Sequence, residues 1–158
     1  MTETAQSLNT RAWFSAAIAE ALNQALADTT VATMLAQNFH WNVKGMAFGP
    51  LHDLFQVIYE DHFVAQDDLA ERIRALNAHA EGNLAAMLKR TKVIESDGKG
   101  TAEEMIAAMQ GAQETLAETL GACGAEAAEQ GDTLTEDLCI ARGQAHEKFA
   151  WMLRSHLG

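Results

Sequence analysis

The feature that most constrains this chain is a stripe of apolar residues between positions 51 and 76. Its members recur at close to the 3.6-residue period of an α-helix, and they are Leu51, Leu54, Phe55, Ile58, His62, Ala65, Leu69, Ile73 and Leu76. This spacing places all of these side chains on one face of a helix. The pattern therefore predicts a long amphipathic helix that begins near Pro50 and ends near Asn77.

Composition agrees with helices and gives little support to strands. The chain is rich in Ala, Leu, Glu, Gln and Met, has a single proline, and has few clusters of β-branched or aromatic residues. A length of 158 residues fits one domain with a sizeable core. We expect a single all-α domain over residues 1–158, with a flexible tail over residues 1–9.

Another helix is predicted before this one, from about Thr10 to Trp41. Its apolar residues also follow the helical period, at Phe14, Ile18, Leu22, Ala25, Ala32 and Phe39. Two glycines lie in residues 43–49, which separate the two helices. Pro50 suits the first position of the second helix, because the missing N–H of proline costs nothing there.

A long connection follows the second helix. Residues 78–100 contain three glycines and only a short helical candidate, over residues 83–89. Such a length is unusual between neighbouring helices of a bundle. It predicts a crossover that carries one short helix.

Two further helices complete the prediction. Thr101 and Glu104 have the spacing of a capping box that opens a third helix, and Gly121, Gly124 and Gly131 should weaken its far end. Asp132 or Thr133 should cap the fourth. The positions expected to face the core are Met105, Met109, Ala112, Leu116 and Leu120, then Leu138, Ala141, Ala145, Phe149 and Met152. Four helices with a long second connection are typical of a ferritin-like bundle.

Charge and apolar content restrict the partners. The formal net charge of -11 argues against unassisted binding to nucleic acid or to an anionic membrane, since phosphate contacts need clustered Lys and Arg. The start has no secretory pattern, and no apolar run approaches the roughly 20 residues that cross a bilayer. We expect a soluble, cytoplasmic protein that handles cations.

Cys123 and Cys139 match neither a disulfide framework nor a zinc spacing, and we interpret both as buried small apolar residues.

Acidic residues on the second helix are candidates for a metal site. Asp67 and Glu71 lie four residues apart, so their carboxylates share one face and would chelate one cation. Taken alone, such a pair is more often solvated surface, and Arg72 and Arg74 offer ordinary ion pairing.

His52 lies on the same side of the predicted second helix as Asp67, but far from it along the helix axis. Fifteen residues separate it from Asp67, which is about 22 Å at the helical rise, so the two cannot hold one ion within a single chain. If two copies of the helix pack antiparallel about a twofold axis near Glu60, His52 of one subunit approaches Asp67 and Glu71 of the other. The chain also lacks the Glu-x-x-His motif with which many ferritin-like di-iron proteins build a site inside one bundle. Both observations favour a site between subunits.

These motifs together resemble the Dps family, the miniferritins. The resemblance rests on His40-Trp41-Asn42 near the end of the first helix, on His52 twelve residues further, and on the Asp67-to-Arg72 motif Asp-x-x-Ala-Glu-Arg. It covers essentially the whole chain, to the KFAWMLRSHL ending, and the joint spacing is specific.

The resemblance implies a hollow dodecamer with ferroxidase sites at its twofold interfaces. Fe(II) would be oxidised there, preferably by hydrogen peroxide, and stored inside as a ferric mineral. By carry-over, His40 and His52 of one subunit and Asp67 and Glu71 of its mate would hold iron, with up to two ions per site.

One position departs from the family pattern. Many members carry an acidic ligand four residues after the second histidine, where this chain has Gln56. We therefore expect the second iron position to be weaker, or to be completed by water or by Asp53.

Trp41 corresponds to a family tryptophan thought to intercept oxidising equivalents, although a large aromatic residue also packs interfaces. The isolated histidine of the apolar stripe, His62, is interpreted as a hydrogen-bonded core residue.

An acidic cluster at the start of the fourth helix has two interpretations. Asp132, Glu136 and Asp137 fall where the family has a threefold pore that admits Fe(II). Acidic residues at a helix start also interact favourably with the helix dipole. We favour the pore role most for Asp137.

Two rival functions remain open from the sequence. DNA binding is expected to be weak or absent, because the N-terminal residues offer only Arg11 and a dodecamer would carry about -132 formally. The second rival function is a redox-inactive cage. It would bind zinc or another divalent ion at the same ligands, since His and carboxylate sites accept several metals.

Overall fold

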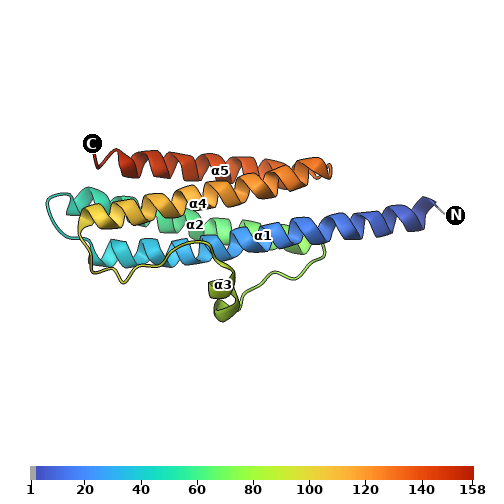
Figure 1. Ribbon diagram of the computed structural model, residues 1–158, viewed down its shortest axis with the longest axis horizontal. Coiled ribbons are helices and arrows are strands. Elements are labelled where there is room, and N and C mark those ends of the chain that lie inside the picture. Colours follow the sequence, from blue (N-terminus) through green and yellow to red (C-terminus); the bar gives the residue numbers. More distant parts are fainter. Residues whose placement is uncertain (1–2) are drawn as a thin grey trace.

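The computed structural model describes the backbone of residues 3–158 and the side chains of residues 16–158. Its helices are α1 (Glu3–Asn42), α2 (Phe48–Ala75), α3 (Leu84–Arg90), α4 (Ala102–Glu129) and α5 (Thr133–Arg154), and the described residues contain no strand. The four long helices form a bundle, and α3 lies outside it, against α1 (Figure 1). The predicted all-α, ferritin-like bundle with a short helix in its crossover is confirmed.

The order of the helices explains the long connection. α1 packs along α2, and α4 packs along α5, with α1 also contacting α4. α2 and α4 run in the same direction, so the chain must return along the bundle between them, and α3 interrupts that return (Figure 1). A short loop could join only antiparallel neighbours.

The core follows the predicted apolar stripes closely. Every predicted position of α2 is buried except Leu76, which is half-buried, and every predicted position of α4 is buried. On α5 the prediction is partly wrong, because Ala141 is exposed. The buried face of α5 consists of Thr135, Cys139, His146, Phe149, Ala150 and Leu153. Two of these residues are polar, so hydropathy alone misjudged the phase of this helix.

The ends of the helices match the expected capping chemistry in two places. The Thr101 side chain accepts from the backbone N–H of Glu104 while the Glu104 carboxylate accepts from that of Thr101, which is the predicted capping box. Asp132, and not Thr133, caps α5. α2 begins at Phe48, two residues before Pro50.

The first helix begins earlier than predicted, at Glu3 instead of about Thr10. Most of the stretch predicted as a tail is therefore helical, and its flexibility stays a prediction. Phe14, an expected core residue, lies outside the residues whose side chains are described.

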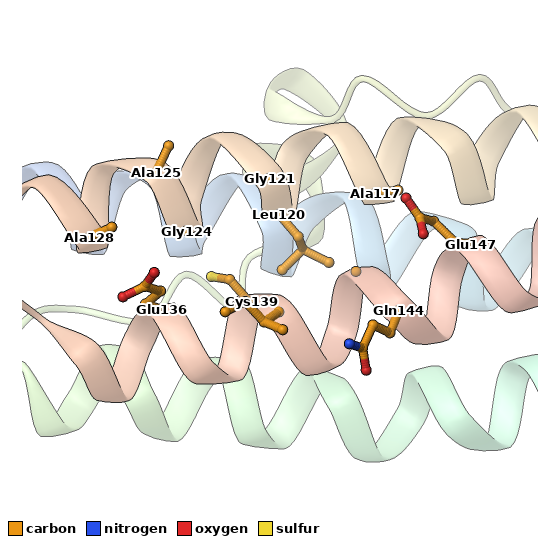
Figure 2. A pocket seen from close by; sticks show the side chains of 12 residues that line it. Ala117, Leu120, Gly121, Gly124, Ala125, Ala128, Glu136, Cys139, Gln144 and Glu147 are labelled. Carbon is orange, nitrogen blue, oxygen red and sulfur yellow. The ribbon is translucent and has the colours of Figure 1, made fainter.

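The glycines within α4 do not interrupt the helix, although the sequence predicted a weaker far end. The helix continues through Gly121 and Gly124 to Glu129. A Cβ atom at Gly124 would lie 3.2 Å from the Cβ of Cys139, so the missing side chain lets α5 approach closely. Small residues of both helices line a groove of about 370 Å³ here (Figure 2). None of the described helices is long and apolar enough to span a membrane.

Candidate metal centre

Two histidines meet where α1 ends and α2 begins. His40 lies in the last turn of α1 and His52 near the start of α2, and the short connection between the helices brings them together. Their rings stack, with centroids 3.7 Å apart and planes inclined by 15°. Both side chains are half-buried, so one edge of the pair remains accessible.

Reciprocal hydrogen bonds fix the two rings. His40 Nδ1 lies 2.7 Å from the carbonyl oxygen of His52, and His52 Nδ1 lies 2.7 Å from the carbonyl oxygen of His40. A carbonyl oxygen only accepts, so each Nδ1 carries the proton and donates it. In the neutral ring each Nε2 then keeps its lone pair, which is the form of imidazole that binds a metal.

Aromatic neighbours hold the ring planes. Tyr59 packs edge-on against His40, with centroids 5.3 Å apart, and Phe48 stacks on His52 at 5.0 Å. Phe39 and Phe55 pack against each other in the core at 5.6 Å. These aromatic contacts therefore help to fix the orientation of both histidine rings.

The predicted carboxylate ligands lie elsewhere. Asp67 and Glu71 are exposed on α2, beyond the histidines by several helical turns. Among residues 16–158 no group of three or more His, Cys, Asp or Glu side chains is close enough to hold a metal ion. One chain thus joins His40 with His52 but brings neither to Asp67 or Glu71.

The neighbours proposed for a second ion are differently engaged. Gln56 is half-buried, and its amide donates to the Glu60 carboxylate at 2.8 Å. Asp53 is exposed on α2 next to His52. Gln56 thus extends away from the histidine pair toward the next turn of the helix.

Large apolar side chains are exposed beside the carboxylates. We call this surface the apolar face, and it comprises Met34 of α1, Phe63 and Val64 of α2, and Leu84 and Leu88 of α3. Two adjoining grooves run through it, and Asp67 lines one of them. Trp41, next to the histidine pair, is also exposed, at 62 %. Exposed apolar patches of this kind are typical of surfaces that contact other molecules.

The three acidic residues near the start of α5 have different environments. Asp132 accepts hydrogen bonds from the Thr135 backbone at 3.1 Å and from Arg72 at 3.0 Å. Partial burial acts to raise its pKa, but these hydrogen bonds and the Arg72 charge lower it overall. Glu136 is half-buried and lines the groove between α4 and α5, and Asp137 is exposed. Of the three, only Asp137 is exposed.

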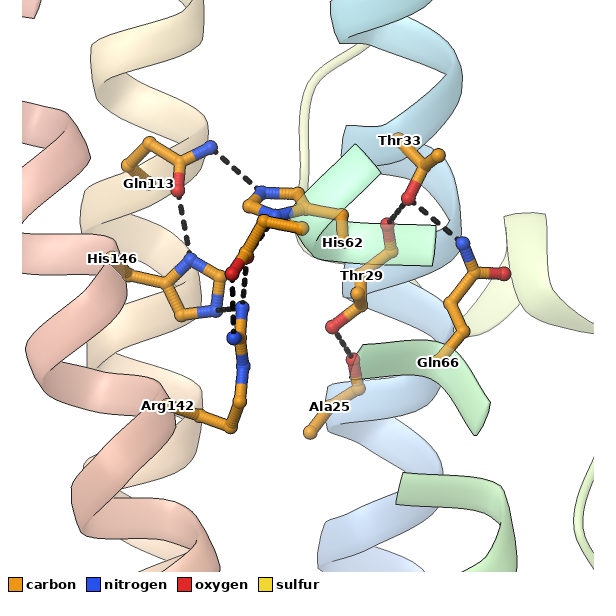
Figure 3. A network of polar contacts seen from close by, with 9 residues as sticks. Ala25, Thr29, Thr33, His62, Gln66, Gln113, Arg142 and His146 are labelled. Atoms are coloured by element: carbon orange, nitrogen blue, oxygen red, sulfur yellow. Dashed lines mark hydrogen bonds and ion pairs between the residues drawn. The ribbon is translucent and has the colours of Figure 1, made fainter. Parts of the chain in front are cut away.

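A buried polar ring in the bundle was only partly predicted. His62 is buried as expected and receives a hydrogen bond from Gln113 at 3.0 Å, and His146 donates to the same amide at 2.8 Å (Figure 3). Arg142 lies 3.3 Å from His146 and pairs with Asp61, which contacts His62. The ring closes with both histidines neutral, and it ties α2, α4 and α5 together.

Burial sets the protonation of this ring. It lowers the pKa of His62, although the Asp61 carboxylate acts in the opposite direction, and it lowers that of His146 to about 2. Hydrogen bonds from His62 and Arg142 outweigh burial at Asp61 and lower the pKa of its carboxyl. No spacing in the sequence singled out His146.

Comparisons with known proteins agree with this architecture. Residues 19–158 match the ferritin-like domain family. General stress protein 20U of Bacillus subtilis is 37% identical over 139 residues, which is 88% of this chain and 96% of that protein. DNA protection during starvation protein 2 of Bacillus anthracis is 33% identical over 140 residues, covering 89% and 96%.

Solved structures show the same similarity. The Dps protein of Vibrio cholerae O1, described as a member of a broad superfamily of ferritin-like diiron-carboxylate proteins, superimposes with a TM-score of 0.89 and 30% identity over 93% of this chain and 92% of that one. Dps from Staphylococcus aureus gives a TM-score of 0.86 and 33% identity, covering 89% and 95%.

Proposed function

This chain belongs to the Dps family of ferritin-like proteins, and from that premise we propose that it oxidises Fe(II), preferably with hydrogen peroxide, and stores the ferric product inside a protein cage. The observation that carries the proposal is the stacked pair of His40 and His52, whose Nδ1 atoms are both occupied by carbonyl groups. Two Nε2 lone pairs held side by side suit a transition-metal ion better than they suit a purely structural role.

The metal site is completed by a second subunit. His40 and His52 of one subunit and Asp67 and Glu71 of its twofold mate supply two imidazole and two carboxylate donors, a set that suits iron. Support comes from the spacing along α2, which separates these groups within one chain, and from the lack of a three-ligand cluster among residues 16–158.

The apolar face is the surface that would be buried in this assembly. Phe63 and Val64 lie a few residues before Asp67 on α2, so covering them with a second copy would also bring that carboxylate to the interface. An antiparallel pairing of α2 helices about a twofold axis near Glu60 places opposite ends together, twice per dimer. Repetition of such dimers in a hollow dodecamer would create the storage cavity.

The reaction is a two-electron reduction of peroxide by two Fe(II) ions. Each ion gives up one electron, the O–O bond breaks, and two protons complete two water molecules. The protein holds Fe(II) at the two Nε2 atoms and the two carboxylates and leaves coordination positions open for the oxidant. Gln56 cannot add charge, so the second Fe(II) binds more weakly, with water or Asp53 completing its ligands.

Passage of Fe(II) into the cage is assigned to Asp137. Its carboxylate is exposed near the start of α5, whereas that of Asp132 already caps α5 and pairs with Arg72. Glu136 is a weaker candidate because it lines the groove between α4 and α5.

Trp41 is exposed next to His40, and a role in intercepting oxidising equivalents and a role in packing the interface both suit it.

Two other functions are tested against this one. Several relatives carry names that refer to DNA protection, but a net charge of -11 per chain predicts weak or absent DNA binding. A gel shift at low and moderate salt decides this, and retention of DNA at moderate salt would overturn the expectation. A redox-inactive cage that binds zinc would take up metal without consuming peroxide.

The deciding experiment is anaerobic loading with Fe(II) followed by hydrogen peroxide. We expect rapid ferric absorbance in the wild type and its loss in the double variant His40→Ala/His52→Ala. His79→Ala is the matched control, because His79 is exposed and lies outside the proposed site. Absence of peroxide consumption by the loaded wild type, or full activity of the double variant, would contradict the proposal.

A further inference from the structure

The two cysteines of the chain face each other across the hairpin formed by α4 and α5. Cys123 lies eight residues before Gly131 and Cys139 eight residues after it, and Gly131 lies in the turn between the antiparallel helices, with a φ of 74°. Equal distances from the turn place two residues at the same height on neighbouring helices. The spacing of sixteen residues, which matches no zinc motif, is therefore the spacing of a cross-hairpin pair.

The two side chains belong to the same buried cluster. Each thiol is near enough to act on the pKa of the other, and neither cysteine is in a disulfide. Gly124, next to Cys123 on α4, brings the backbones of the two helices close at this height, as Figure 2 shows for Gly124 and Cys139. The close approach is thus built into both the backbone and the side chains.

Each cysteine is among the residues that line a surface groove. Cys139 lines the groove of about 370 Å³ between α4 and α5. Cys123 lines another, of about 340 Å³, on the α1 side of α4. The side chains themselves are almost fully covered, at 3 % exposure for Cys139 and 0 % for Cys123. A small oxidant such as peroxide reaches this depth more readily than a bulky thiol reagent, and Cys139 is the more accessible of the two.

Their proximity makes the two thiols unequal. The neighbouring thiol of Cys123 lowers the pKa of Cys139, whereas the neighbouring thiol of Cys139, together with burial, raises the pKa of Cys123. Because the thiolate is the nucleophile, this asymmetry assigns the first step of an oxidation to Cys139.

We propose that Cys123 and Cys139 are a dithiol that hydrogen peroxide oxidises to a disulfide within one chain. Cys139 attacks the peroxide; an S–O bond forms, the O–O bond breaks, and one water leaves. Cys123 then attacks the sulfur of the sulfenic acid at Cys139, so that an S–S bond forms, the S–O bond breaks and a second water leaves. The two thiols lose two electrons and two protons in total, and the peroxide takes up both.

The inference does not rest on the metal site. The dithiol would remove peroxide without iron, once per chain until a reductant restores it, and the disulfide would join α4 to α5 covalently. Failure of iron oxidation would leave this proposal standing, and failure of disulfide formation would leave the ferroxidase proposal standing.

The test uses the full-length, metal-free, reduced protein treated with hydrogen peroxide after the reductant is removed. We expect the thiols titrated in denaturant to fall from two per chain to none, with an intact-mass loss of two hydrogens and no cross-linked chains on a non-reducing gel. Peptide mapping should join the peptides that carry Cys123 and Cys139, and dithiothreitol should restore both thiols.

Single variants separate the two steps. Cys123→Ser should leave a sulfenic acid at Cys139 that dimedone traps, whereas Cys139→Ser should leave Cys123 largely reduced over the same time. Retention of both thiols in the wild type, addition of oxygen without an S–S link, or disulfides only between chains would each overturn the proposal. Peptide mapping of the wild type decides between these outcomes even if a variant fails to fold.

Discussion

His40 and His52 each donate a hydrogen bond from Nδ1 to the backbone carbonyl of the other, over 2.7 Å in both directions. Because the two residues share these bonds and stack face to face, neither ring is oriented independently. Each histidine is thus both a proposed iron ligand and a support for the other ligand.

Replacing one of the two histidines should therefore slow Fe(II) oxidation by more than the loss of a single ligand would. We expect His40→Ala and His52→Ala each to slow Fe(II) oxidation by at least about tenfold, the size of effect seen when a metal ligand loses its hydrogen-bonded support. The double variant should be little worse than either single one. Stopped-flow initial rates with peroxide measure this, and strictly multiplicative losses would show that the rings act separately.

A carboxylate at position 56 should strengthen the second iron position. Gln56→Glu restores the acidic residue four positions after His52, at a cost of about 0.2–0.5 kcal/mol from repulsion with Glu60. Anaerobic Fe(II) titration of the wild type should give one tight ion per site and one weaker ion, and that of the variant two ions of similar affinity. Two equal tight ions in the wild type would contradict the role given to Gln56.

Mixed assemblies test whether the site lies between subunits. Subunits with His40→Ala/His52→Ala and subunits with Asp67→Ala/Glu71→Ala should each be inactive. Co-expressed with different tags and purified through both, randomly mixed assemblies should recover about one quarter of wild-type activity, because half of the twofold interfaces pair unlike subunits and each regains one of its two sites. A site within one chain would give no recovery.

The sequence was sufficient for the fold where burial follows hydropathy. The stripe on α2 is continuous, and its helix and buried face were predicted almost completely. The capping box of Thr101 and Glu104 was also predicted correctly, because it depends on residues three positions apart. Local periodicity and local hydrogen bonding are visible in a single sequence.

The sequence did not predict the core correctly where polar residues are buried. Thr135 and His146 face the core from α5. Thr135 accepts from Arg72 of α2 and His146 donates to Gln113 of α4, so these partners on other helices could not be seen in a local pattern. The reciprocal bonds of His40 and His52 depend on the path of the connection between α1 and α2, which spacing does not specify. The proximity of Cys123 to Cys139 was missed for a related reason, since it requires the register of the α4–α5 hairpin.

The acidic residues at the start of α5 should separate by function when neutralised. Asp137→Asn should slow iron uptake and leave stability unchanged, because the carboxylate is exposed. Asp132→Ala should destabilise the protein by about 0.5–2 kcal/mol, as expected for loss of a helix N-cap, and should also break the pair with Arg72. Mineral formation and denaturant midpoints measure the two effects. Unaltered uptake in Asp137→Asn would remove the pore assignment.

The buried ring of His62, Gln113 and His146 should make the fold sensitive to acid. Both histidines have folded-state pKa values below the ordinary 6.5, so the unfolded chain binds more protons and stability falls as pH drops below about 6.5. Each histidine should contribute a slope of about 1.4 kcal/mol per pH unit well below that point, and for His146 the loss extends to about pH 2. Denaturant unfolding at pH 7.5, 6.0 and 5.0 should show a shallower slope in His146→Gln than in the wild type, while the exposed-site control His79→Gln keeps the wild-type slope. Equal slopes in all three proteins would mean that His146 takes up its proton in the folded state as readily as in the unfolded chain, which would contradict the lowered pKa.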